Sequence, residues 1–213
     1  MKVSIIIPYK EDRGWLNEAI ESVENQTYKD IELILSQGSG TVGENINKGL
    51  KKSTGELITY LCDDDLLPSK SIEDRVKGMK DFDFIHSRGV HYFSPTNVKP
   101  YSMTNPNTDF KYCLESNGIM GGSTMYKADL FKEFKFNEKL TTAEEWEFHL
   151  RLLNSGKSIG FVDRITYFYR RHKDQKSIGN LNHDYQKKRQ KIKDEIKKLY
   201  SPNSGSTSIN RGG

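Results

Sequence analysis

Leu57-Ile58-Thr59-Tyr60-Leu61-Cys62-Asp63-Asp64-Asp65-Leu66-Leu67-Pro68 is an apolar run that ends in three consecutive aspartates. An apolar run of this length, bounded by turn residues, predicts a buried strand. The aspartates then follow the carboxyl end of that strand, which is where open α/β sheets bind their ligands. Three neighbouring carboxylates repel one another unless a cation neutralises them. The stretch therefore predicts a sheet strand with a charged site at its end.

Asp63, Asp64 and Asp65 offer carboxylate oxygens, which are the hard ligands that Mg²⁺ and Mn²⁺ prefer. A cation held in this way commonly bridges phosphate groups of a ligand. We therefore predict that the cluster binds a divalent metal together with a phosphate-bearing ligand. The alternative is a solvated acidic turn that caps the next helix, because Asp is common at turns and helix N-termini.

Strand and helix patterns alternate around this stretch as far as residue 90. The sequence predicts strands over 3–7, 31–35, 57–62 and 82–86. It predicts helices over 15–23, 44–52 and 71–79, the last of them capped by Ser69 or Ser71. Such alternation is typical of βαβ units, so we predict an α/β fold with a mostly parallel central sheet flanked by helices.

The pattern loosens after residue 90. Residues 94–110 are rich in Pro, Asn, Ser and Thr and predict a loop. A strong helical pattern covers 143–153, and two short strands and a basic helix follow at 159–162, 165–169 and 184–200. We predict a single domain over 1–180, a C-terminal basic helix over 181–200 and a disordered tail over 201–213.

The composition fits a soluble globular protein, with 34% hydrophobic and 29% charged residues among 213. No apolar run approaches the roughly 20 residues needed to cross a bilayer. The N-terminal residues have neither the apolar length nor the cleavage pattern of a signal peptide. The cysteines, Cys62 and Cys113, are too few for a disulfide framework and lack metal-ligand spacing. We therefore predict a cytoplasmic protein.

Positive charge gathers toward the C-terminus. The net charge is +4, but residues 164–200 hold 12 Lys or Arg against 4 Asp or Glu, which leaves −4 on the remainder. A basic segment of this kind fits an anionic membrane surface or an anionic polymer such as nucleic acid. A membrane contact would make the protein peripheral at the inner membrane face. The alternative is a helix that packs on the core and keeps its lysines in water.

Several segments share their order and spacing with one known family: Val3 to Tyr9, Ser22 to Tyr28, Ile31 to Ile34, Asn47 to Leu50, Thr54 to Glu56 with the aspartates, Ala143 to Leu152, and Tyr169 to His172. Together they resemble the family-2 glycosyltransferases of the GT-A (Rossmann-like) fold. The aspartates correspond to that family's D-x-D motif, and the segment around Glu145 corresponds to its catalytic helix. The resemblance covers roughly residues 1–175 of the chain.

The resemblance implies an inverting transfer of a sugar from a nucleotide-diphosphate donor, with a UDP-sugar favoured, to a hydroxyl of a glycan, lipid-linked or other acceptor. Residues 1–90 would bind the nucleotide sugar and 91–180 the acceptor. Mn²⁺ or Mg²⁺ would neutralise the leaving diphosphate. Asp63 and Asp64 are then assigned to the donor, and Asp64 and Asp65 to the metal, with His172 as a further metal ligand.

The resemblance also assigns Glu145 as the general base that takes the proton of the acceptor hydroxyl, where the family usually has Asp. The alternative is that Glu144 and Glu145 are first-turn acids favoured by the helix dipole.

Further donor-binding residues follow from the same resemblance. Gln37 stands where the family has an acid that reads the base, and an amide can both donate and accept hydrogen bonds. Backbone amides in a small-residue segment are expected to approach the sugar. The donor-binding set is thereby completed by Pro8, Tyr9, Glu11, Gln37, Gly121 and Gly122.

Two other functions are weighed against this one. A catalytically degenerate nucleotide-sugar-binding or adaptor module is favoured by Ser36 and Gln37 in place of the family's acids, but the retained Glu145 argues against it. A sugar nucleotidyltransferase would need a Gly-rich, Arg-containing loop straight after the first strand. This chain has Tyr9-Lys10-Glu11-Asp12-Arg13-Gly14 there, which disfavours that function.

Overall fold

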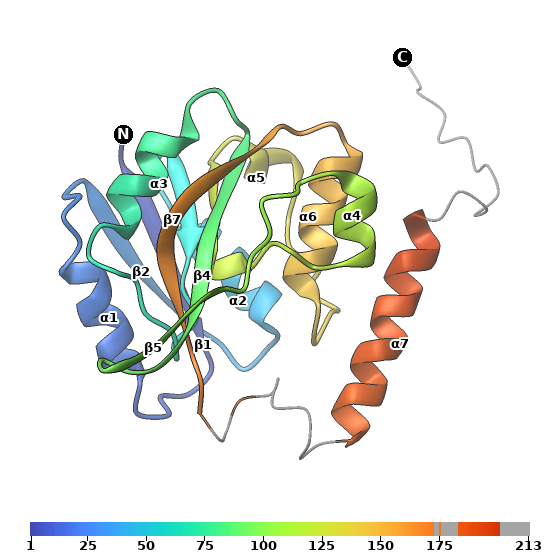
Figure 1. Cartoon of the computed structure of the whole chain (residues 1–213), viewed down its shortest axis with the longest axis horizontal. Helices are drawn as coiled ribbons and strands as arrows, with labels where there is room; N and C mark the ends of the chain where they lie inside the picture. Colours follow the sequence, from blue (N-terminus) through green and yellow to red (C-terminus); the bar gives the residue numbers. More distant parts are fainter. Residues whose placement is uncertain (173–174, 176–182, 201–213) are drawn as a thin grey trace.

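The computed structural model describes residues 1–172, 175 and 183–200, which form a central sheet with helices on both faces (Figure 1). The strands are β1 (Val3–Tyr9), β2 (Ile31–Gln37), β3 (Leu57–Tyr60), β4 (Phe84–Ser94), β5 (Asn97–Ser102), β6 (Met125–Lys127) and β7 (Ile159–Arg170). The helices are α1 (Leu16–Glu24), α2 (Val42–Leu50), α3 (Ser71–Met79), α4 (Phe110–Glu115), the 3₁₀ turn η1 (Gly121–Ser123), α5 (Leu130–Glu133), α6 (Glu144–Asn154) and α7 (His183–Tyr200).

The strand order is β2-β1-β3-β6-β4-β5, and β7 pairs with the other edge of β4. β1 is parallel to β2 and β3, and β4 is parallel to β7, whereas β5 and β6 are antiparallel to their neighbours. Within the described residues, all strands except β5 and β6 therefore run in one direction, which confirms a mostly parallel sheet. The short antiparallel strand β6 separates β3 from β4.

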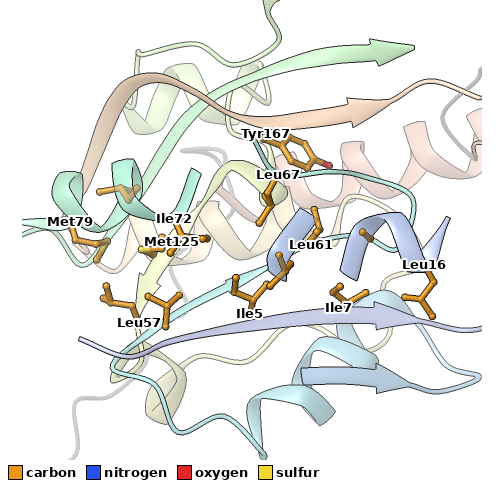
Figure 2. Packing of buried hydrophobic residues seen from close by; sticks show 14 residues of the cluster. Ile5, Ile7, Leu16, Leu57, Leu61, Leu67, Ile72, Met79, Met125 and Tyr167 are labelled. Atoms are coloured by element: carbon orange, nitrogen blue, oxygen red, sulfur yellow. The ribbon is translucent and has the colours of Figure 1, made fainter. Parts of the chain in front are cut away.

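Two hydrophobic clusters cover the two faces of the sheet, because successive side chains of a strand point to opposite faces. Ile5 and Ile7 of β1 pack with α1 and α3, whereas Ile6 packs with α2, α5 and α6. Figure 2 shows the first cluster, in which Leu57 and Tyr167 bring in β3 and β7. This double burial fixes β1 and β3 at the centre of the fold, so the loops that follow them are held in place.

The prediction of a loop over residues 94–110 was wrong for residues 97–102, whereas residues 103–109 form neither helix nor strand. β5 lies in this segment and pairs with β4, from Val90 opposite Ser102 to Ser94 opposite Asn97. β5 is an edge strand, where a proline such as Pro100 is tolerated because its missing N–H is not needed. β4 accordingly extends to Ser94, beyond its predicted end at residue 86.

The two short strands predicted on either side of residue 163 are one strand, β7. Its register against β4 shifts between Ser87, which is opposite Val162, and Arg88, which is opposite Ile165. The intervening residues form a bulge, and Asp163 in that bulge pairs with Arg88. A bulge interrupts the alternation of a strand without ending it, which explains the incorrect prediction.

The predicted cap of α3 was also wrong. The N-cap is Lys70, without a side-chain cap bond, and Ser71 instead donates its hydroxyl to the Thr166 carbonyl at 2.7 Å in the core. The short helices α4 and α5 were not predicted, because four to six residues give too little periodicity to detect.

The predicted basic helix is α7, which stands beside α4 and α6 in Figure 1. Ile196 is buried against this pair, Tyr185 lies 3.1 Å from Thr142 Oγ1, and Lys197 lies 2.6 Å from Glu115. The helix therefore packs on the core while lysines such as Lys187, Lys188 and Lys191 stay exposed. Residues 181–182 and the tail predicted over 201–213 lie outside the described residues. Among the described helices, none has the length and apolar character to cross a membrane.

His86 of β4 is expected to make the fold sensitive to acid. The side chain is fully buried, neither ring nitrogen has a hydrogen-bond partner among the described residues, and burial lowers the pKa of His86 to about 4. The unfolded chain binds a proton near pH 6.5, so stability is lost as the pH falls below that value. Between pH 7 and pH 5, the wild-type protein should lose about 2 kcal/mol more unfolding free energy than His86→Phe does. Urea unfolding at each pH measures this.

Phenylalanine is a suitable replacement because the His86 ring already packs against the Phe161 ring, with centroids 4.9 Å apart and the planes tilted by 52°. The comparison cancels the contributions of other titrating groups, which both proteins share. Equal pH slopes in the two proteins would show that His86 is not held neutral by burial.

Candidate active site

The loop that carries the three aspartates leaves β3 and is fastened to β7. Leu66 donates its N–H to the Phe168 carbonyl at 3.1 Å and accepts from the Phe168 N–H at 2.9 Å. Asp65 is 1% exposed, and its two oxygens accept from the Tyr167 hydroxyl and from the Arg170 backbone N–H, the latter at 2.8 Å. Burial raises the pKa of Asp65 well above its usual range. Asp65 therefore anchors the loop.

Asp63 and Asp64 share a cation, Arg13, which comes from the loop between β1 and α1. Arg13 Nη2 lies 2.9 Å from Asp64 Oδ2 and 3.3 Å from Asp63 Oδ1. Both carboxylates keep some access to solvent, with side-chain exposures of 14% for Asp63 and 16% for Asp64. Burial, together with the Asp64 charge, raises the pKa of Asp63, and Arg13 opposes this effect.

His172 is brought to the same carboxylate. Its Nε2 lies 3.2 Å from Asp64 Oδ2, and its ring packs against Trp15 with centroids 4.0 Å apart and the two planes tilted by 39°. The Arg13 guanidinium lies 5.6 Å above the Trp15 ring. Trp15, the first residue of the helix predicted over 15–23, is instead the residue that precedes α1, and it supports this cluster. The role of His172 as a metal ligand stays a prediction.

The donor atoms around Asp64 suit a divalent cation. One ligand atom from each of Cys62, Asp64 and Asp65 lies within 4.8 Å of the others. Burial raises the pKa of the Cys62 thiol well above its ordinary value, and a protonated sulfur is a poor ligand for a hard cation. Asp64, with His172 beside it, therefore offers the accessible oxygens for Mn²⁺ or Mg²⁺. The predicted metal contact of Asp65 would involve oxygens that are already hydrogen-bonded.

Glu145 lies in the first turn of α6, next to the end of β3. Its Oε2 accepts from the Gly121 N–H at 3.0 Å and lies 3.4 Å from the hydroxyl of Tyr60, the last residue of β3. Burial, reinforced by the charge of Glu144, raises the pKa of Glu145 to about 7. A carboxyl with this pKa exchanges a proton readily at neutral pH, as a general base requires. Ala143, which precedes the helix, has a φ of +60°, a conformation that is uncommon for residues other than glycine.

Gly121 and Gly122 are needed for close packing around this carboxylate. A Cβ at Gly121 would collide with Tyr60 and Glu145, and one at Gly122 would collide with the Tyr167 ring. The Gly121 amide is thus engaged by Glu145. The predicted contact of these glycines with the donor sugar stays a prediction.

A buried arginine of α3, Arg75, holds η1 in place through hydrogen bonds to the backbone of that turn. Its guanidinium donates to the carbonyls of Gly122, Thr124 and Thr166 at 2.7, 3.1 and 2.8 Å, and to the hydroxyls of Thr59 and Thr166 at 3.0 and 2.8 Å. Burial lowers the pKa of Arg75 to about 9, so the group keeps its charge at neutral pH. The local sequence does not mark this residue as buried, because an arginine in a surface-type helix pattern indicates exposure.

The residues predicted to bind the nucleotide base gather at one edge of the sheet. Tyr9 ends β1 directly opposite Gln37, which ends β2, and Pro8 precedes Tyr9 in the same strand. The Gln37 side-chain amide donates to the Lys10 carbonyl at 3.3 Å, and Glu11 is exposed in the loop that follows. Because β1 is parallel to β3, this edge is also the one that carries the aspartates. Base binding by these residues stays a prediction.

Trp146 and a groove beside α1 lie outside this site. Trp146 is 3% exposed and donates its indole N–H to the Cys113 carbonyl at 2.6 Å, so it belongs to the core. The groove, about 440 Å³ in volume, lies between α1 and the β4–β5 hairpin. It contains none of the acids described above, and it is lined by Ser22, Asn25, Leu66, Leu67, Pro68, Ser69, Tyr92, Pro95, Val98 and Phe168.

Comparisons with known sequences agree on one family. The model of glycosyl transferase family 2 matches residues 35–135. An uncharacterised glycosyltransferase of Rickettsia felis is 28% identical over 221 residues, covering 85% of this chain and 36% of the relative. The GalNAc(5)-diNAcBac-PP-undecaprenol β-1,3-glucosyltransferase of Campylobacter jejuni is 29% identical over 99 residues, covering 33% of this chain and 32% of the relative. The chain spans about a third of the length of the first two curated relatives, 36% of each.

Solved structures share the fold. TarS residues 1–349 from S. aureus, in complex with UDP-GlcNAc, superpose with a TM-score of 0.69 at 18% identity, covering 95% of this chain and 68% of that chain. The complex of the same protein with UDP gives a TM-score of 0.64 at 18% identity, covering 80% and 61%. The likeness confirms the predicted GT-A fold.

Replacement of Arg75 should reveal how strongly the fold depends on it. Arg75→Leu leaves the three carbonyl and two hydroxyl acceptors without their buried donor. We expect a loss of about 3–5 kcal/mol in unfolding free energy, measured by urea titration. The matched control Arg164→Leu, at an exposed position of β7, should change stability by less than about 0.5 kcal/mol. Equal stabilities of the two variants would contradict the role given to Arg75.

Proposed function

We propose that the chain is a glycosyltransferase of family 2 and that it transfers a sugar from a UDP-sugar to a hydroxyl group of an acceptor, with inversion at the anomeric carbon. The observation that carries the proposal is the arrangement at the end of β3. Glu145, with a pKa of about 7, contacts Tyr60 at the end of that strand, and the Asp63–Asp64 pair follows the same strand. Glu145 suits proton transfer, whereas the Asp63–Asp64 pair suits a cation and the phosphates that it accompanies.

Glu145 acts as the general base in the proposed reaction. Its carboxylate takes the proton of the acceptor hydroxyl while that oxygen forms a bond to the anomeric carbon. The bond from this carbon to the diphosphate oxygen breaks, and the diphosphate leaves with the electron pair. Attack from the face opposite to the leaving group inverts the configuration. The hydrogen bond from the Gly121 amide and the contact with Tyr60 keep the carboxylate oriented during this step.

Asp64 holds a divalent cation in this proposal, with Asp63 and His172 beside it. When bound, Mn²⁺ or Mg²⁺ offsets the negative charge that develops on the departing diphosphate. Asp65 contributes by keeping the loop against β7, because both of its oxygens are hydrogen-bonded there.

The nucleotide is proposed to lie across the ends of β1 and β2. Tyr9 offers an aromatic face for the base, and Gln37 offers an amide for its edge, while Pro8 and Glu11 flank them. UDP is the nucleotide that we favour, because a protein of the same fold is known in complexes with UDP and UDP-GlcNAc.

The acceptor is proposed to be a glycan, with a lipid-linked glycan favoured. The named activity of the Campylobacter relative supports this preference. The exposed lysines of α7, including Lys187, Lys188 and Lys191, offer a surface for an anionic membrane or polymer. A cytoplasmic protein in peripheral contact with the membrane would reach such an acceptor. The competing function is a nucleotide-sugar-binding module without activity, which Gln37 in place of an acid favours.

Donor binding can be tested by calorimetry with UDP in the presence of Mn²⁺. We expect the wild-type protein to bind UDP only with the metal, and Asp64→Asn to weaken binding at least about tenfold, because a ligand charge is lost. Asp81→Asn, which removes a charge from an exposed position away from the site, is the control and should bind like the wild type. Failure of the folded wild-type protein to bind UDP, GDP, dTDP or CMP nucleotides would contradict the proposed donor class.

Glu145→Gln should separate catalysis from binding. We expect kcat to fall by about 10²–10⁴-fold, while UDP affinity changes less than about threefold, because the base acts on the acceptor. The wild-type rate should rise with pH through about 7, as Glu145 loses its proton. Hydrolysis or transfer of a radiolabelled UDP-sugar provides the measurement.

Glu144→Gln is the matched variant for the pH profile. The Glu144 charge raises the pKa of Glu145, so its removal should shift the rising limb to lower pH while activity remains. Sugar transfer that is unchanged in Glu145→Gln would rule out Glu145 as the base. UDP binding without any turnover in the wild type would favour the inactive binding module.

A further inference from the structure

We propose that Arg13 competes with the divalent cation for Asp64 and then binds the diphosphate of the donor, so that metal and donor binding are coupled through this side chain. The inference rests on the proposed donor function. A residue of the loop between β1 and α1 thereby takes part in recognition of the donor.

The competition follows from the contacts of one oxygen. Asp64 Oδ2 lies 2.9 Å from Arg13 Nη2 and 3.2 Å from His172 Nε2. A divalent cation binds a carboxylate oxygen at roughly 2.0–2.6 Å. Such a cation on Asp64 Oδ2 would lie beside the guanidinium, and two positive groups at that separation repel each other strongly. The guanidinium must therefore leave Asp64 when the cation binds.

Arg13 is placed so that it can leave without being lost from the site. Its side chain is 33% exposed, whereas the backbone of its loop is held by Asp12, which accepts from the Gly14 N–H at 2.7 Å. The guanidinium lies over Trp15, which in turn packs against the His172 ring. Released from the carboxylates, the charge stays next to this aromatic pair, at the rim of the proposed cation site.

The diphosphate is the natural second partner of this charge. Asp64 would hold the cation, and the cation would offset the charge of the diphosphate there, so the diphosphate would lie near Arg13, which contacts the same carboxylate. A guanidinium binds phosphate with two parallel hydrogen bonds and stays charged at all physiological pH values. Arg13 would therefore exchange a pair of carboxylates for a pair of phosphate oxygens.

This exchange has a thermodynamic consequence. Without the nucleotide, the interaction of Arg13 with Asp63 and Asp64 opposes metal binding. With the nucleotide, the interaction of Arg13 with the diphosphate favours the complex. Metal and nucleotide then increase each other's affinity by the same factor, since coupling between two ligands is reciprocal. Arg13 is the residue that carries part of this coupling.

The test compares Arg13→Gln with Lys10→Gln, which removes the same charge from an exposed position of the same loop. Binding of Mn²⁺ alone is followed by the electron paramagnetic resonance signal of the free ion. Binding of UDP at saturating Mn²⁺ is followed by calorimetry. We expect Arg13→Gln to bind Mn²⁺ about 3- to 10-fold more tightly than Lys10→Gln, and UDP about 3- to 10-fold more weakly.

Arg13→Lys supplies a second comparison. It keeps the charge, so its Mn²⁺ affinity should stay within about twofold of the wild type, but it loses the paired hydrogen bonds and should bind UDP more weakly. Equal Mn²⁺ affinities of Arg13→Gln and Lys10→Gln would overturn the competition. Weaker binding of both ligands by Arg13→Gln would also overturn it, because a merely structural ion pair would give that result.

The proposed donor function can fail separately from the competition. If the wild-type protein binds Mn²⁺ but no UDP, the donor function and the phosphate contact of Arg13 are both overturned. The Mn²⁺ affinities then still decide whether Arg13 and the cation share Asp64. Unchanged UDP affinity in Arg13→Gln, with UDP bound by the wild type, would overturn the phosphate contact alone.

Discussion

The buried carboxylate of Asp65 connects the loop after β3 to β7, and the geometry of the site depends on this connection. Its two oxygens accept from the Tyr167 hydroxyl and the Arg170 amide, and the Leu66–Phe168 pair extends the contact by one residue. Arg170 adds hydrogen bonds to the Asp64 carbonyl at 2.8 Å and to Glu18 at 2.8 Å. Because Asp65 fixes the loop, Asp63 and Asp64 are held in position without having to make those hydrogen bonds themselves.

The acids near the end of β3 have different surroundings, and these surroundings give them different chemical properties. Glu145 has partial burial and a like charge beside it, and these raise its pKa to about 7. Asp63 and Asp64 face Arg13, which offsets their charges. A protein can thus keep one carboxyl ready to accept a proton and another ready to bind a cation within a small volume, provided that their environments differ.

Arg75 shows how a buried charge can organise a site from a distance. Its hydrogen bonds join β3, η1, the residue before β6, and β7, and the same turn η1 presents the Gly121 amide to Glu145. Burying a guanidinium is costly, but full hydrogen bonding compensates for much of that cost. A network of this kind tolerates little displacement, which suits a turn that holds the carboxylate proposed as the general base.

The sequence alone determined the alternating strands and helices up to residue 90, because buried parallel strands and amphipathic helices leave strong local patterns. It also marked Asp64 and Glu145 as candidate site residues, since acids after a buried strand and at the start of a helix stand out, and the resemblance supplied the roles proposed for them. It did not reveal the hairpin of β4 and β5, the bulge of β7, or Arg13, Trp15, Arg75 and Tyr167 as parts of the site. These features arise from contacts between residues far apart in the chain. Arg13 and Asp64, which form an ion pair, are 51 residues apart in the sequence, and Asp65 and Tyr167, which share a hydrogen bond, are 102 residues apart. Only the tertiary structure decides which side chains share a carboxylate, because that choice is made by packing and burial rather than by local sequence.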